Sequence, residues 1–75
     1  MRQMVLEPAI GAVDGINRDF RTTTSYVPGS TVVFLNGLVV PRSATNGWTE
    51  TRHNQIRLKE APLSGDDVQV YYQPL

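Results

Sequence analysis

The sequence contains no cysteine, and His53 is its only histidine in 75 residues. Without cysteine the chain can form no disulfide, and one histidine alone cannot supply the ligand set of a structural zinc site. A domain of this size buries only about 60% of its unfolded surface, so its isolated fold is marginal. We therefore expect no metal and no cofactor, and we expect association with copies of itself or with other chains to add stability.

The sequence also lacks an excess of charge and a long apolar run. Seven Lys and Arg residues balance seven Asp and Glu residues, whereas proteins that bind nucleic acid normally carry a basic excess. No run approaches the ~20 apolar residues of a membrane span. The N-terminal segment MRQMVLEPAIGAV contains Glu7 and Pro8 and is a poor signal peptide. We expect a protein made in the cytoplasm, without a membrane partner and without direct contact to nucleic acid.

Catalytic motifs are missing as well. The sequence has no phosphate-binding loop of the form GxxxxGK[ST] and no nucleophile elbow around a serine. Asp66 and Asp67 are adjacent, and adjacent strand residues point to opposite sides, so they form no ready acid–base pair. Turn formation explains these residues better, as it explains Asp14 and Asp19. We expect neither an enzyme nor a small-molecule substrate.

Signals for β structure dominate what is present. Thr, Val, Ile and aromatic residues form short runs that Gly or Pro interrupts, and no window has helical apolar spacing. The pattern predicts an all-β fold, a small antiparallel β-sandwich or barrel of about six short strands. Residues 1–12 form an N-terminal arm or first strand, and residues 13–75 form a single domain. Extended segments are indicated at residues 3–6, 19–24, 31–36, 38–41, 48–51, 55–60 and 68–73.

Two turns and two hairpins can be predicted within this pattern. Pro28-Gly29 favours a type II turn, and Asn36-Gly37 favours the type I′ turn that joins the strands of a hairpin. Apolar and polar residues alternate in residues 55–60 and again in residues 68–73, with a Gly/Asp turn between them. This alternation predicts a second hairpin with one side in water.

The run around Asn36-Gly37 is apolar on both sides of its first strand. Val32, Val33, Phe34 and Leu35 follow one another, and a strand that is apolar on both sides is normally covered on both. One side can line the core, and the other needs a partner subunit; alternatively, Phe34 and Leu35 fold over an edge of the core. The candidate protein-interface residues are Met4, Leu6, Val33, Leu35, Trp48 and Tyr71.

The order of these segments resembles a small β module of virion proteins of tailed bacteriophages. The resemblance rests on VDGINRDFRT (residues 13–22), YVPGSTVVFLNGL (26–38), GWTET (47–51) and IRLKEAPLSGDDVQVYY (56–72). Trp48 stands where the module has a tyrosine, and the first dozen residues lie outside the pattern. The module occurs in stand-alone structural proteins and in the attachment regions of tail fibres. A fibre would need a long shaft after the module, and the sequence ends at Leu75, so we expect a separate small subunit.

The resemblance implies a non-enzymatic structural protein located in the virion. We expect it to bridge other virion proteins, and copies of itself, in the head–tail connector (neck) or the tail attachment region. A capsid decoration protein is the alternative within this class. A small carbohydrate- or nucleic-acid-binding β module is the alternative from another class, with Trp48 and Tyr71 as the aromatic candidates for sugar binding.

Overall fold

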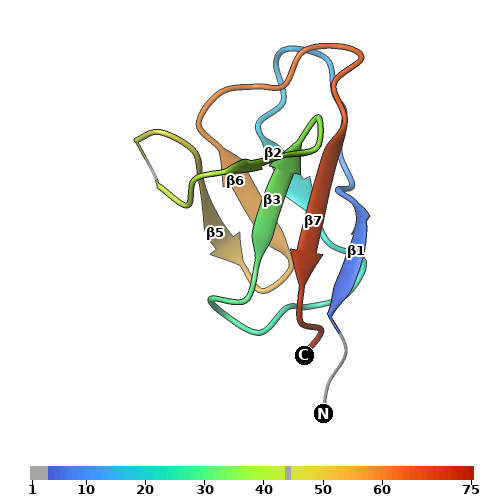
Figure 1. Ribbon diagram of the computed structural model, residues 1–75, viewed down its shortest axis with the longest axis vertical. Coiled ribbons are helices and arrows are strands. Elements are labelled where there is room, and N and C mark those ends of the chain that lie inside the picture. Colours follow the sequence, from blue (N-terminus) through green and yellow to red (C-terminus); the bar gives the residue numbers. More distant parts are fainter. Residues whose placement is uncertain (1–3, 44) are drawn as a thin grey trace.

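Seven short strands make up the regular structure of the described residues. Figure 1 shows their arrangement and labels all of them except β4. The computed structural model describes residues 4–43 and 45–75, so the expected arm is seen only from Met4 onward. The strands are β1 (Val5–Pro8), β2 (Asp19–Arg21), β3 (Val32–Leu35), β4 (Leu38–Val40), β5 (Trp48–Arg52), β6 (Gln55–Leu58) and β7 (Val68–Tyr72).

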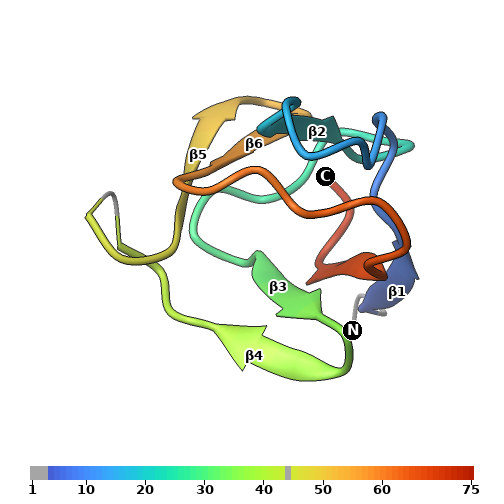
Figure 2. The same cartoon turned by 90° about the horizontal axis from the view of Figure 1, so that it is seen from above.

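The strands form two antiparallel sheets. Sheet A has four strands in the order β1-β7-β3-β4, and sheet B has three in the order β2-β6-β5. Every pairing between strands is antiparallel. Viewed from above, the two sheets lie on opposite sides of the molecule, with β3 and β4 facing β5 and β6 across the interior (Figure 2). The all-β class is confirmed, and the arrangement is that of a small β-sandwich.

The core lies between the inner sides of the two sheets. Sheet A contributes Val33, Val68, Val70 and Tyr72, and sheet B contributes Phe20, Trp48, Ile56 and Leu58, while Tyr26 enters from the turn before β3. Alternate residues of each strand point inward, as expected from the two-residue period of a β-strand. Burial of these large side chains supplies the main favourable free energy of folding.

Both predicted turns are present. Asn36 and Gly37 have φ values of 52° and 84°, which are the positive values that a type I′ turn requires at its two central positions. At Pro28-Gly29, the Ser30 amide donates to the Val27 carbonyl oxygen at 3.0 Å, and Gly29 has a φ of 84°. That combination is a type II turn.

The predicted hairpin between residues 55–60 and 68–73 is wrong. β6 lies in sheet B and pairs with β2 and β5, whereas β7 lies in sheet A between β1 and β3. The segment between them is long enough to cross from one sheet to the other, so both strands turn their alternating apolar sides to one core from opposite directions. The hairpin partner of β6 is instead β5, which precedes it in the chain and pairs with it next to a bulge between Glu50 and Arg52.

The N-terminal segment belongs to the sandwich. Val5–Pro8 pairs along β7, with Val5 opposite Tyr72 and Leu6 opposite Tyr71. Val5 and Ala9 pack against the core. Of the two alternatives for this segment, a first strand is what the structure shows.

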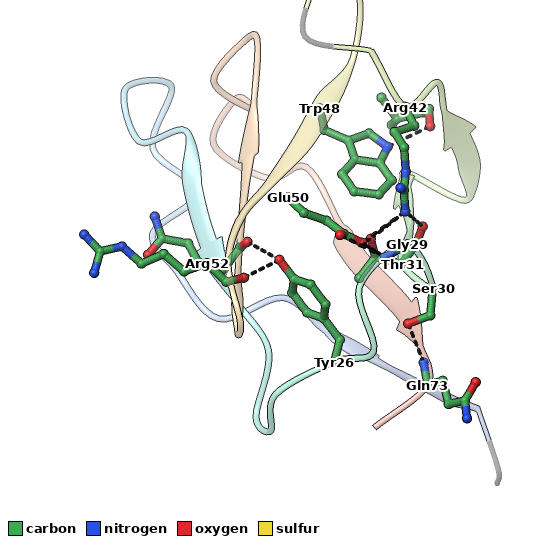
Figure 3. A network of polar contacts seen from close by, with 11 residues as sticks. Tyr26, Gly29, Ser30, Thr31, Arg42, Trp48, Glu50, Arg52 and Gln73 are labelled. Atoms are coloured by element: carbon green, nitrogen blue, oxygen red, sulfur yellow. Dashed lines mark hydrogen bonds and ion pairs between the residues drawn. The ribbon is translucent and has the colours of Figure 1, made fainter. Parts of the chain in front are cut away.

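Tyr26 ties the loop before β3 to the β5–β6 hairpin. Its side chain is 2% exposed, and its hydroxyl donates to the carbonyl oxygens of Arg52 and Gln55, the latter at 2.7 Å (Figure 3). Burial, assisted by the negative charge of Glu50, raises the pKa of Tyr26 to about 12. The folded state therefore holds the neutral phenol more strongly than the unfolded chain does.

We expect alkaline conditions to destabilise the fold through Tyr26. The stabilisation from the raised pKa is complete below the unfolded value of about 10 and is lost as the pH rises through about 12. Tyr26→Phe should lower the free energy of unfolding at pH 7 by about 1–2 kcal/mol and should flatten the decline at high pH. Urea unfolding of both proteins from neutral to alkaline pH measures this. Equal alkaline slopes would show that Tyr26 has no such role.

Candidate protein-interaction surface

The side of sheet A that faces away from the core is apolar. Val33 and Val70 point into the core and are paired with each other, so their strand neighbours point outward. The outward residues include Val32 and Phe34 of β3, Val39 of β4, Tyr71 of β7 and Leu6 of β1, and Met4 continues the alternation before β1. We call these six residues the outer apolar face: Met4, Leu6, Val32, Phe34, Val39 and Tyr71.

These side chains are accessible to solvent in the folded chain. Leu6 is 58% exposed and Val39 is 63% exposed, and Met4 and Tyr71 are 37% exposed each. A large apolar side chain has an area of roughly 150–200 Å², so the face offers on the order of 400 Å². This is close to a tenth of the total accessible surface of 4739 Å². A standard interface buries about 800 Å² on each partner, so the face supplies roughly half of that area.

No strand residue on this side of sheet A carries a charge. Besides the apolar residues, the outward strand positions hold Gln69 on β7, which is polar but neutral, and Pro8 at the end of β1. A shallow hollow of about 160 Å³ lies on this side between Leu6, Phe34, Gly37, Asp67 and Gln69. Asp67 stands at its margin, where its amide donates to the Asn36 side chain at 2.8 Å. The face has the uncharged centre and polar margin of a protein–protein contact.

The corresponding side of sheet B is different. Phe20, Ile56 and Trp48 point into the core, so Asp19 and Arg21, Gln55 and Arg57, and Thr49 and Thr51 point outward. These residues form the polar, charged surface that an antiparallel sheet normally presents to water. The two outer sides of one small sandwich therefore differ sharply in polarity.

A hollow of about 200 Å³ on sheet B is lined by three basic residues, Arg18, Arg57 and Lys59. Arg57 binds Asp19 through two hydrogen bonds of 2.8 and 3.1 Å, and this contact lowers the pKa of the Asp19 carboxyl. Arg18 donates to the Lys59 carbonyl oxygen at 3.2 Å. Both arginines are thus engaged by acceptors of the chain itself, and the hollow makes no case for an anion site.

Of the six predicted interface residues, three lie on the outer apolar face: Met4, Leu6 and Tyr71. Leu35 is half-buried and packs against the core from the inner side of sheet A. The prediction is wrong for Val33 and Trp48, which are 0% and 2% exposed and belong to the core. The sequence prediction also missed Val32, Phe34 and Val39.

The errors on β3 share one cause. Because the run Val32–Leu35 is apolar throughout, the sequence does not reveal which alternate residues point inward, and a shift of one residue exchanges the two sides. The partner strand holds the missing signal, since the alternation of β7 fixes Val70 inward and Val70 is paired with Val33. The inward residues are therefore Val33 and Leu35, and the outward ones are Val32 and Phe34.

Trp48 is held in the core by a polar cluster, shown in Figure 3. Its indole N–H donates to the Val40 carbonyl oxygen at 2.9 Å, and the Arg42 guanidinium lies 5.1 Å from the centre of the ring. Glu50 binds Arg42 at 3.0 Å and accepts from the Gly29 amide at 3.0 Å and from the Thr31 hydroxyl. This cluster joins β5 to the segments before β3 and after β4. A buried ring covered by Arg42 gives a sugar no aromatic platform.

The remaining titratable residues that the sequence singled out have structural roles. His53 is exposed and shares a hydrogen bond of 2.8 Å with the Ser25 hydroxyl. Asp14 accepts the amides of Ile16 and Asn17 at 2.9 Å each, which lowers its pKa. Asp66 accepts the Leu63 amide at 2.9 Å inside a turn. Within residues 4–43 and 45–75, no three His, Cys, Asp or Glu residues come together as metal ligands.

Two further findings complete the description. The part of the chain that the structure covers includes no helix of the length and apolarity that crossing a bilayer requires. Comparison of the chain with protein-family models, with curated proteins and with solved structures finds no match. The case for function therefore depends on the surface of the fold and on the resemblance in sequence.

A matched pair of valines tests whether the outer apolar face is dispensable for folding. Val33→Ala, in the core, should lower the free energy of unfolding by about 2 kcal/mol or more because it leaves a cavity. Val39→Ala, on the outer face, should change it by less than about 1 kcal/mol. Denaturant unfolding of dilute protein measures both values. If both variants lost similar free energy of unfolding, the outer apolar face would contribute to folding and would not be a surface available to a partner.

Proposed function

We propose that this protein is a non-enzymatic structural subunit of a tailed-bacteriophage virion. It is made in the host cytoplasm and joins other virion proteins, and copies of itself, in the head–tail connector (neck) or the tail attachment region. The observation that carries the proposal is the uncharged outer apolar face of sheet A. The resemblance of the turn and core segments to the phage module gives that face its biological setting.

The outer apolar face supports an assembly role on energetic grounds. Burying about 400 Å² of apolar surface contributes on the order of 10 kcal/mol before the costs of association are subtracted. For a domain with little stability of its own, such a contact is a large addition. The polar outer side of sheet B leaves the subunit soluble before it is assembled.

The proposal also fits the chemistry that the described residues offer. The titratable side chains considered above serve turns, an ion pair or the polar cluster around Trp48. The hollows are shallow, and the one on the outer apolar face is lined by Leu6 and Phe34 with polar groups at its margin. Such a surface binds another protein surface rather than activating a substrate.

Quantitative mass spectrometry of purified particles tests the location. We expect a ring at the neck or tail to contain roughly six to twelve copies per particle, related by cyclic symmetry. Hundreds of copies would instead identify a capsid decoration protein. Absence of the chain from purified particles would overturn the proposal.

A pair of identical substitutions tests the face itself. Leu6→Lys places a charge on the outer apolar face, and Leu63→Lys makes the same change in the exposed loop between β6 and β7. The two leucines are 58% and 67% exposed, so both variants should fold. We expect Leu6→Lys to reduce incorporation into particles by about tenfold or more and Leu63→Lys to leave it unchanged. Equal incorporation of the two variants would contradict a role for this face.

A further inference from the structure

The two sheets end in four edge strands, β1 and β4 in sheet A and β2 and β5 in sheet B. An edge strand leaves backbone N–H and C=O groups unpaired, and these can pair with a strand of another molecule. Natural sheets block such pairing with charged residues, proline, bulges or a covering segment. The four edges of this protein differ in how well they are blocked.

Three of the edges carry a recognisable block. β1 contains Glu7 and Pro8. β5 has the bulge between Glu50 and Arg52, and Arg52 adds a charge. β2 is covered at Arg21 by Ile10, and the two residues exchange backbone hydrogen bonds of 2.8 Å in both directions. Pairing of these edges with another chain is therefore hindered.

The edge at β4 has no such block. Its three residues are Leu38, Val39 and Val40, without charge, proline or bulge, so only the shortness of the strand and Pro41 directly after it limit pairing. Leu38 is 73% exposed and Val39 is 63% exposed. In Figure 2 β4 is the outermost strand of its sheet, with no strand beyond it. The most apolar edge of the sandwich is also the least protected one.

The turn geometry determines which backbone groups this edge offers. Leu35 and Leu38 flank the two-residue turn and form the hydrogen-bonded pair of the hairpin, so Val40 is the next residue bonded to β3. Val39 lies between them, opposite Phe34, and its N–H and C=O point away from β3. The Val39 N–H is thus an available donor and the Val39 C=O an available acceptor. When two copies of β4 lie antiparallel, the N–H of each Val39 can bond to the C=O of the other.

The side chains at this edge are complementary to themselves. Leu38 and Val40 project on the inner side of sheet A, next to a hollow of about 270 Å³. Leu35, Val40 and Leu58 form its apolar part, and the rest of its lining is Thr45, Asn46, Gly47, Lys59 and Glu60. If Val39 pairs with Val39 of another copy, Leu38 of that copy falls opposite Val40. The exposed leucine of each molecule then meets the apolar part of the other molecule's hollow, formed by Leu35, Val40 and Leu58.

We propose that β4 is a self-association edge, at which two copies of this chain pair their β4 strands antiparallel about Val39. The pairing is two-fold symmetric and joins the two four-stranded sheets into one continuous sheet. This proposal follows from the geometry of the edge and does not depend on the proposed role in a virion. Apart from Val39, whose side chain lies beside its own copy in the pair, the outer apolar face stays open, so a subunit can contact its own copy at the edge and another protein at the face.

The charges and the area at this edge predict a weak dimer. No charged residue lies in β4, so two copies meet without repulsion. The contact buries on the order of 700 Å² in total, which is below the ~1,000 Å² of a stable interface. We therefore expect a dissociation constant between about 10 μM and 1 mM. Repetition of the contact within a larger assembly raises its effective strength.

Sedimentation equilibrium of the purified chain tests the pairing. The wild-type chain should show a monomer–dimer equilibrium within about 10 μM to 1 mM. Val39→Lys adds the charge that blocks an edge, and it should weaken dimerisation by about tenfold or more. Ile16→Lys makes the same kind of change at a loop residue that is 82% exposed, and it should leave the dissociation constant unchanged. Leu38→Lys serves as a second edge variant should Val39→Lys fail to fold.

The other outcomes overturn the proposal. A wild-type chain that is monomeric at about 1 mM has no such edge contact. Dimers that persist in both edge variants use another surface. Because Val39 also belongs to the outer apolar face, dimers weakened by Val39→Lys and Tyr71→Lys but not by Leu38→Lys are stacked through that face. Equal loss in Ile16→Lys would show a general effect of charge. Because Leu6→Lys changes only the outer apolar face and Leu38→Lys changes only the edge, the particle role and self-association fail separately.

Discussion

Sheet A carries apolar side chains on both of its sides, and sheet B can cover only one of them. The inner side, with Val33 and Val70 at its centre, builds the core. The outer side, with Leu6, Val39 and Tyr71, remains exposed in the folded chain. Among residues 4–43 and 45–75, no third layer covers that side. The proposed assembly role depends on this exposed side.

Contacts elsewhere in the fold fix the positions of the strands that carry this side. The type I′ turn at Asn36-Gly37 holds β3 and β4 in register, so Phe34 and Val39 stay side by side on the outside. The cluster of Arg42, Trp48 and Glu50 fixes the segment after β4 to β5. Tyr26 closes the other end of the sandwich through its buried hydroxyl. Since these contacts are internal, the outer side requires no rearrangement before it meets a partner.

Much of the fold could be predicted from the sequence because its signals are local. Turn residues and β-forming runs gave the all-β class, both tight turns and the approximate position of each strand. The pairing of β6 and β7 could not be obtained in this way, since sheet membership depends on where a long loop leads the chain. The prediction of which β3 residues point inward failed for a related reason. The run has no alternation of its own, so its orientation follows from its pairing with Val70 on the neighbouring strand.

The sequence predicted that an apolar surface is exposed, but only three of the six residues predicted for it lie there. Apolar residues on both sides of one strand indicated an uncovered face, and Met4, Leu6 and Tyr71 lie on it. Trp48 was misplaced because a lone tryptophan in sequence does not reveal its partners. Its burial depends on Val40 and Arg42, which lie on other segments. The β4 edge could be recognised only once the strand order was known.

Hydroxyl-radical footprinting of Met4 and Tyr71, in the free chain and in purified particles, tests the central claim most directly. Both side chains lie on the outer apolar face and are partly exposed in the isolated molecule, and both residue types react readily when water reaches them. We expect strong labelling of the free chain and marked protection in particles, with Leu63, in the loop between β6 and β7, serving as the reference. Equal labelling of Met4 and Tyr71 in the two samples would show that nothing covers the face, and the assembly role would then be contradicted.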